Sequence, residues 1–120
     1  MNSLNLAWES FDFYSGKVSQ AEYEHSNFLN DLDGDFLNFL PKSEKDSLLS
    51  KYKIIYNNLN ILYGKYIDNL SELIALNNNI IDIPIEREID TATLLTLKEV
   101  TTALRSELLI SSKKIFDILS

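Results

Sequence analysis

Apolar residues recur three or four positions apart along most of the chain, which is the spacing of one face of an α-helix. No segment alternates apolar and polar residues convincingly enough to predict a β-strand. The pattern therefore predicts an all-α protein with about four main helices. We expect them from Leu4 to Ser15, from Ser19 to about Asp31, from Glu44 to Leu76, and from Glu86 or Asp90 to Leu119.

A local signal separates the first two of these helices. Gly16 and Lys17 interrupt the pattern, and Ser19-Gln20-Ala21-Glu22 fits a capping box. In that motif the serine hydroxyl accepts a hydrogen bond from the backbone N–H of Glu22, whose side chain reaches back to the first residue. We therefore expect one helix to end near Gly16 and another to begin after Ser19.

The two longer helices each carry an unbroken heptad-type seam. The first seam consists of Leu49, Tyr52, Tyr56, Leu59, Tyr63, Tyr66, Leu70 and Leu73, and the second of Leu94, Leu97, Thr101, Leu104, Leu108, Ser111, Ile115 and Ile118. Matching seams joined by one connection predict an antiparallel helical hairpin. We expect a single bundle domain over residues 1–120, built around that hairpin.

Shorter segments complete the bundle. Ser43-Glu44-Lys45-Asp46 is a looser capping box at the start of the third helix. The apolar residues 36–40 predict one or two helical turns that cover one end of the bundle. Residues 80–85 are too apolar to lie free in water, so we expect them to pack on a bundle end.

Composition limits the chemistry. The chain has 120 residues, of which 45% are hydrophobic and 24% are charged, values typical of one globular domain. It has no cysteine, which excludes disulfides, thiolate zinc sites, iron–sulfur clusters and cysteine catalysis. Its single histidine excludes a histidine-cluster metal site. We therefore expect neither a metal nor another cofactor.

No motif predicts an enzyme. His25 lies on the predicted apolar face, where a satisfied core histidine is expected rather than a general base. An Asp-x-Asp-x-Asp run begins at Asp31 as a calcium loop does, but its sixth position is Phe36 and its twelfth is Lys42. There is no glycine-rich phosphate loop and no nucleophile elbow. A binding protein is the better interpretation.

Charge indicates the kind of partner. The formal net charge is −7, and residues 1–40 hold seven acids and one base. Such a chain repels nucleic-acid phosphates and attracts a basic protein. The sequence shows no signal peptide and no apolar run that could span a membrane, so we expect a cytoplasmic location.

The acidic residues of the second helix and its exit form the candidate binding surface, with two aromatic residues as anchors. The candidate residues are Phe13, Glu22, Tyr23, Glu24, Asn27, Asp31, Asp33 and Asp35. Charge-assisted hydrogen bonds to Arg or Lys would hold the partner, and the anchors would supply buried area. The alternative is a solvated helix face whose acids favour a helix N-terminus.

The order of residues 8–23 is similar to that of a known family. A short helix is followed by Gly-Lys-Val-Ser and then by a capped helix that contains Glu-Tyr. Over about residues 8–32 this resembles the start of colicin D-type immunity proteins. The resemblance implies a small bacterial helical bundle that binds a cognate nuclease toxin and covers its basic active site with acidic side chains.

Three function classes remain open at this point, and an enzyme is a fourth and least favoured class. The first is an immunity or inhibitor protein against a basic toxin. The second is a phage-encoded inhibitor of a nucleic-acid enzyme, of the anti-CRISPR type, which would use the same physics. The third is a helical adaptor or chaperone that oligomerises through its heptad seams, for which a homodimer is possible.

Overall fold

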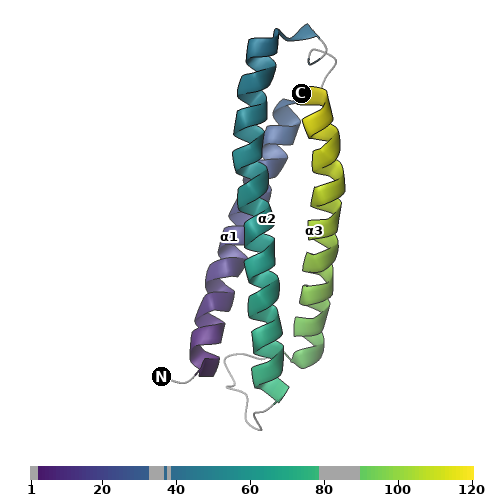
Figure 1. Ribbon diagram of the computed structural model, residues 1–120. Helices are drawn as coiled ribbons and strands as arrows, with labels where there is room; N and C mark the ends of the chain where they lie inside the picture. The colour runs from purple at the N-terminus through teal and green to yellow at the C-terminus, as the bar shows by residue number, and fades with distance from the viewer. Residues whose placement is uncertain (1–2, 33–36, 38, 79–89) are drawn as a thin grey trace.

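The computed structural model describes residues 3–32, 37, 39–78 and 90–120. In these residues the chain forms three helices and no strand: α1 (Ser3–Asp31), α2 (Lys42–Asn78) and α3 (Thr91–Leu119). They run up, down and up in an elongated body of 61 × 23 × 17 Å (Figure 1). The all-α class and the antiparallel hairpin are confirmed. The expected count of about four helices is not, because the described residues form three.

The predicted break at Gly16 is wrong, because α1 is continuous from Ser3 to Asp31. Its buried face runs across the glycine, with Trp8 on one side and Val18 and Ala21 on the other. Glycine within a helix costs about 1 kcal/mol relative to alanine, whereas burying one large apolar side chain contributes about 1.5–3 kcal/mol. Packing therefore outweighs the local stop signal. Ser19 lies mid-helix and does not act as a cap.

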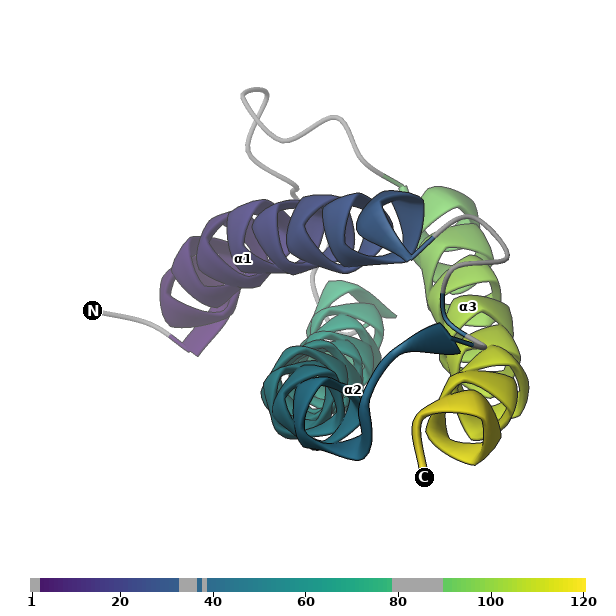
Figure 2. The ribbon, with the colours of Figure 1, turned by 90° about the horizontal axis from the view of Figure 1, so that it is seen from above.

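Helix α2 lies at the centre of the fold. It packs against both α1 and α3, whereas α1 and α3 make few contacts with one another (Figure 2). Tyr52, Leu70 and Leu73 of its seam are completely buried. The predicted α2 seam is confirmed, since its other members are buried or half-buried.

Helix α2 begins one residue after a proline. The carbonyl oxygen of Pro41 accepts a hydrogen bond from the backbone N–H of Lys45 at 3.1 Å. Ser43 therefore lies in the first turn of the helix, and the looser capping box predicted there is wrong. Proline is suited to this place because the helix needs its carbonyl group but not an N–H.

Helix α3 begins at the second of the two predicted starts. The side chain of Asp90 caps it, with Oδ1 accepting from the backbone N–H of Thr93 at 2.8 Å. The α3 seam is confirmed as far as Leu108 and again at Ile115, which is half-buried against the core. Elsewhere beyond Leu108, the buried residues are Ser112 and Leu119 in place of the predicted Ser111 and Ile118. A straight helix has 3.6 residues per turn, so its contact face drifts by about 20° per heptad.

The core is divided into two clusters along the bundle. The larger one surrounds Trp8, Tyr63 and Leu70, and the smaller one contains Phe28 and Tyr52 together with Leu32, Leu37 and Leu119. Leu37 is buried, in accord with the predicted cover over one bundle end. The neighbouring positions 36 and 38, and the predicted packing segment 80–85, lie outside the described residues.

Candidate functional site

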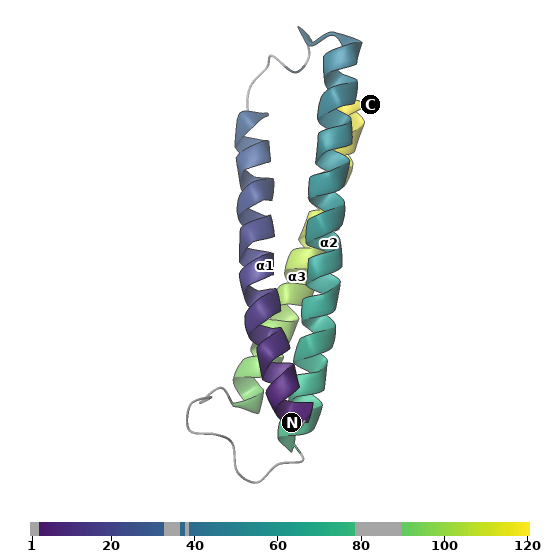
Figure 3. The same ribbon diagram turned by 90° about the vertical axis from the view of Figure 1, so that its left-hand side faces the viewer.

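Helices α1 and α2 run alongside one another (Figure 3). Between them lie two adjoining hollows that α3 does not line. Their volumes are about 350 and 380 Å³, and Glu24 borders both. We call the two together the outer groove. At the Asp31 end the groove lies between Glu24, Asn27 and Asp31 of α1 and Lys51, Ile54 and Ile55 of α2. At the Phe13 end it lies between Phe13, Lys17 and Glu24 of α1 and Asn58, Leu62 and Lys65 of α2.

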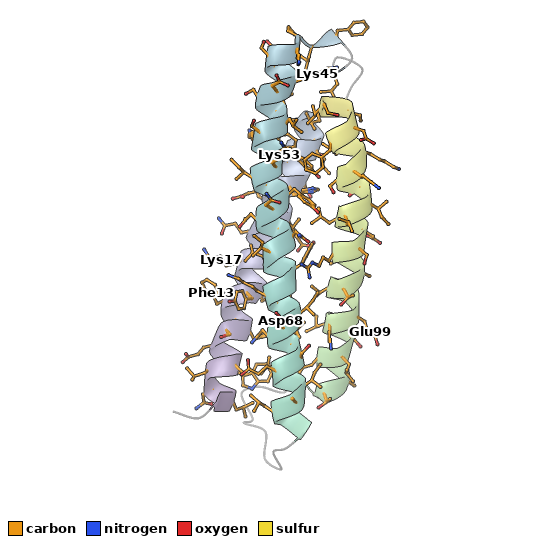
Figure 4. The ribbon with its side chains drawn as sticks, in the orientation of Figure 1. Phe13, Lys17, Lys45, Lys53, Asp68 and Glu99 are labelled. Atoms are coloured by element: carbon orange, nitrogen blue, oxygen red, sulfur yellow. The ribbon has the colours of Figure 1, made fainter. Side chains whose placement is uncertain are left out.

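Helix periodicity brings the α1 wall together. Positions 13, 17, 20, 24, 27 and 31 alternate four and three apart, so they follow one flank of the helix. Phe13 is 56% exposed, and Phe13 and Lys17 project from α1 on the side away from α3 (Figure 4). The Lys17 Nζ atom lies 5.7 Å from the centroid of the Phe13 ring, a cation–π contact that orients both side chains.

The α2 wall is apolar at the Asp31 end of the groove. Ile54 is 72% exposed, and Ile55 beside it is half-buried. Phe28 of α1, which is buried, lines the same hollow. The Nζ atom of Lys51 lies 5.8 Å from the centroid of the Phe28 ring. At the Asp31 end the groove therefore offers an apolar floor with charged side chains at its edges, the usual composition of a protein-binding surface.

Of the three helices, only α1 has a net negative charge. This helix has five acids and one lysine, whereas α2 has four acids and five lysines, and α3 has three acids and four basic residues. The resulting charges are −4, +1 and +1. A cationic partner is therefore attracted to the α1 side of the molecule.

The structure brings together four of the predicted site residues, Phe13, Glu24, Asn27 and Asp31, which all line the outer groove. Tyr23 is 68% exposed on α1 but lines neither hollow. Asp33 and Asp35 lie outside the described residues.

Glu22 lies on another flank of α1, in a smaller hollow of about 170 Å³ that all three helices line. Its Oε2 atom accepts a hydrogen bond of 2.7 Å from the Tyr63 hydroxyl. Burial of that hydroxyl raises the pKa of Tyr63, and the bond to Glu22 and the charge of Glu107 raise it further. Glu22 therefore joins α1 to α2, and it does not face the outer groove.

His25 occupies the buried position predicted for it and is 8% exposed. Its Nε2 atom lies 2.9 Å from the Tyr52 hydroxyl oxygen, so the two side chains share a hydrogen bond. Burial lowers the pKa of His25, and burial together with the nearby Tyr56 raises the pKa of Tyr52 to about 12. Both groups are neutral near pH 7, and their bond serves the packing of α1 on α2.

Sequence reasoning missed most of the α2 wall. Lys51, Asn58 and Lys65 are spaced by seven, with Ile55 and Leu62 between them, which places all five on one flank of α2. This spacing was available in the sequence. The spacing alone does not identify these residues as a groove wall, because tertiary packing decides which flank of α2 lies beside α1.

Two further observations concern the described part of the chain. In it, no group of three His, Asp or Glu side chains is placed to hold a metal ion. None of its three helices combines the length and the apolar character that a bilayer-spanning helix needs.

No protein-family model matches the chain, and no curated protein or solved structure shows significant similarity to it. The function is therefore inferred from the geometry and charge of the outer groove.

Proposed function

We propose that this protein is a small acidic immunity or inhibitor protein, which binds a basic toxin through the outer groove and blocks its active site. The toxin class that fits best is a nuclease, because its active site carries Arg and Lys side chains that bind phosphates. In the complex, the carboxylates of Glu24 and Asp31 take the place of substrate phosphates. The observation that carries the proposal is the acidic flank of α1 beside an exposed apolar floor.

The energetics require both parts of this surface. An exposed ion pair contributes only about 0–1 kcal/mol, so Glu24 and Asp31 alone would bind weakly. Burial of Ile54 and Phe13 against the partner supplies the larger share, at about 25 cal/mol per Å² of apolar surface. The carboxylates then add fast, steered association and selectivity for a cationic partner.

The resemblance of residues 8–32 to colicin D-type immunity proteins supports the same class. It rests on residue order, since the Gly-Lys-Val-Ser stretch lies inside the continuous helix α1.

The heptad seams favour an inhibitor over an adaptor that oligomerises through them. Tyr52, Leu73 and Leu94 of the two seams are fully buried within one chain, so these residues are not available to a second copy. An inhibitor of a phage-targeting nucleic-acid enzyme uses the same surface as a toxin inhibitor, and the identity of the captured partner separates these two.

The test is capture of the partner from the native host, followed by assay of its nuclease activity. The wild-type protein is expected to inhibit the captured enzyme. The variant Glu24→Lys/Asp31→Lys is expected to bind at least about tenfold more weakly and to lose inhibition in proportion, because each carboxylate becomes a repelling charge.

A matched control reverses two exposed acids of α3, Glu99 (Figure 4) and Asp117, which line neither hollow of the groove. This control is expected to bind and inhibit as the wild type does. Unchanged affinity and inhibition in the Glu24→Lys/Asp31→Lys variant would rule out the proposal.

A further inference from the structure

We infer that the segment received by the outer groove is an amphipathic α-helix of the partner, basic in its N-terminal half and acidic in its C-terminal half. This inference rests on the proposed function in one respect, that a partner binds at this groove. It adds the secondary structure, the charge pattern and the direction of the bound segment.

The shape of the groove fits a helix. At about 1.5 Å per residue, the α1 wall from Phe13 to Asp31 is about 27 Å long, which is the length of a helix of about 18 residues. The facing wall of α2 from Lys51 to Lys65 runs antiparallel to it. Two adjacent helices with an apolar floor between them form the groove into which a third amphipathic helix packs.

Exposed apolar side chains mark where that helix makes contact. Ile54 is 72% exposed and Phe13 is 56% exposed, at opposite ends of the groove. Half-buried Ile55 and Leu62 connect the two ends along α2. An apolar stripe on a partner helix would cover all four side chains at once.

Charge changes sign along the groove. Glu24, Asp31 and Lys51 border the hollow at the Asp31 end, which gives it a net charge of −1, and Lys17, Lys65 and the shared Glu24 border the hollow at the Phe13 end, which gives it a net charge of +1. Lys51, whose ammonium group lies over the Phe28 ring, reduces the negative charge of the Asp31 end without reversing it. A complementary helix therefore carries basic residues at the Asp31 end and acidic residues at the Phe13 end.

The helix dipole sets the same direction. The N-terminus of a helix carries about half a positive charge and its C-terminus about half a negative charge. Binding is favoured when the N-terminus lies near Asp31 and the C-terminus near Lys65, so the bound helix runs antiparallel to α1. A second copy of this chain is a poor occupant, because two molecules of net charge −7 repel each other.

The first arm of the test uses two lactam-bridged helical peptides of about 18 residues, a length that matches the groove. Both carry the same leucine stripe and the same numbers of Lys and Glu. In one peptide Lys fills the N-terminal half and Glu the C-terminal half, and in the other the two alternate. Fluorescence anisotropy is expected to show at least about tenfold tighter binding of the first peptide. Equal affinities would overturn the inference.

The second arm reverses charges on the protein. Glu24→Lys/Asp31→Lys and Lys17→Glu/Lys65→Glu are each expected to weaken binding of the first peptide by about tenfold or more. The four substitutions together are expected to restore affinity to within about threefold of the wild type, because the peptide then binds in the opposite direction. Failure of the fourfold variant to recover binding, with a helical circular dichroism spectrum like that of the wild type, would overturn the inference.

The captured partner separates this inference from the proposed function. If Glu24→Lys/Asp31→Lys abolishes its binding but Lys17→Glu/Lys65→Glu does not, the two-signed helix is wrong and the acidic inhibitor surface stands. If both arms of the peptide test succeed but no nuclease is inhibited, the helix groove stands and the proposed function fails.

Discussion

Polar side chains in the interface between α1 and α2 fix how the two helices align. The amide nitrogen of Asn69 donates to the carbonyl oxygen of Ala7 at 3.0 Å, near one end of the interface. The bond between His25 and Tyr52 lies toward the other end. Sliding one helix by a heptad would leave these groups buried without their partners, at a cost of about 1–3 kcal/mol for each. They therefore hold the two walls of the outer groove in register.

The buried histidine makes the stability of the protein depend on pH. Because burial lowers the pKa of His25 in the folded state, the unfolded chain takes up a proton first as the pH falls below about 6.5. Above that pH, the neutral imidazole makes its full contribution to the free energy of unfolding. Below it, the free energy of unfolding falls by at most about 1.4 kcal/mol per pH unit. Urea unfolding at pH 7.5 and 5.5 measures this loss. In the variant His25→Gln, most of the difference in free energy of unfolding between the two pH values is expected to disappear. An unchanged difference would contradict its attribution to His25.

The bond between Tyr63 and Glu22 is testable by removing one hydroxyl group. Tyr63→Phe is expected to lower the free energy of unfolding by about 1.5 kcal/mol, the low end for a bond to a charged group because Glu22 is partly exposed. Tyr23→Phe is the matched control, since Tyr23 is 68% exposed on the same pair of helices. Chemical denaturation that showed equal effects for the two variants would mean that the buried bond contributes nothing.

At the scale of the elements, long-range periodicity predicted the helices better than local motifs did. The seams of α2 and α3 were readable from spacing alone, because each buried side chain follows the last by three or four residues. The break in α1 was inferred from Gly16 and from the motif at Ser19, which describe the chain only locally. Burial of Val18 and Ala21 against α2 depends on a neighbour that the sequence does not reveal, and that burial decides the outcome.

Substitution of Gly16 tests the continuity of α1, and Gly64 of α2 serves for comparison. A Cβ atom at Gly16 would meet nothing within 4 Å beyond its chain neighbours and the surrounding helix backbone, so Gly16→Ala is expected to stabilise the protein by about 0.5–1 kcal/mol. A Cβ atom at Gly64 would lie 3.1 Å from the Arg105 guanidinium, which donates to Asn60 at 3.0 Å. Gly64→Ala is therefore expected to gain less. Thermal unfolding compares the two, and destabilisation by Gly16→Ala would indicate that α1 is broken there.

At the scale of the whole molecule, the sequence predicted one wall of the candidate site. Phe13, Glu24 and Asp31 were identified from charge and helical spacing, because these depend on one helix alone. The wall that contains Lys51 and Ile54 was not identified, because which flank of α2 faces α1 is decided by tertiary packing. The change of charge sign lies on α1 alone, in Lys17, Glu24 and Asp31, but the groove along which it runs requires both walls.

The central claim is that a partner binds across α1 and α2 at the outer groove. Hydrogen–deuterium exchange of the protein, free and in complex with its captured partner, tests this claim most directly. The account predicts slower exchange in the complex over residues 13–31 and 51–65, with α3 unchanged. Protection confined to α3, with exchange in α1 the same in both states, would contradict it.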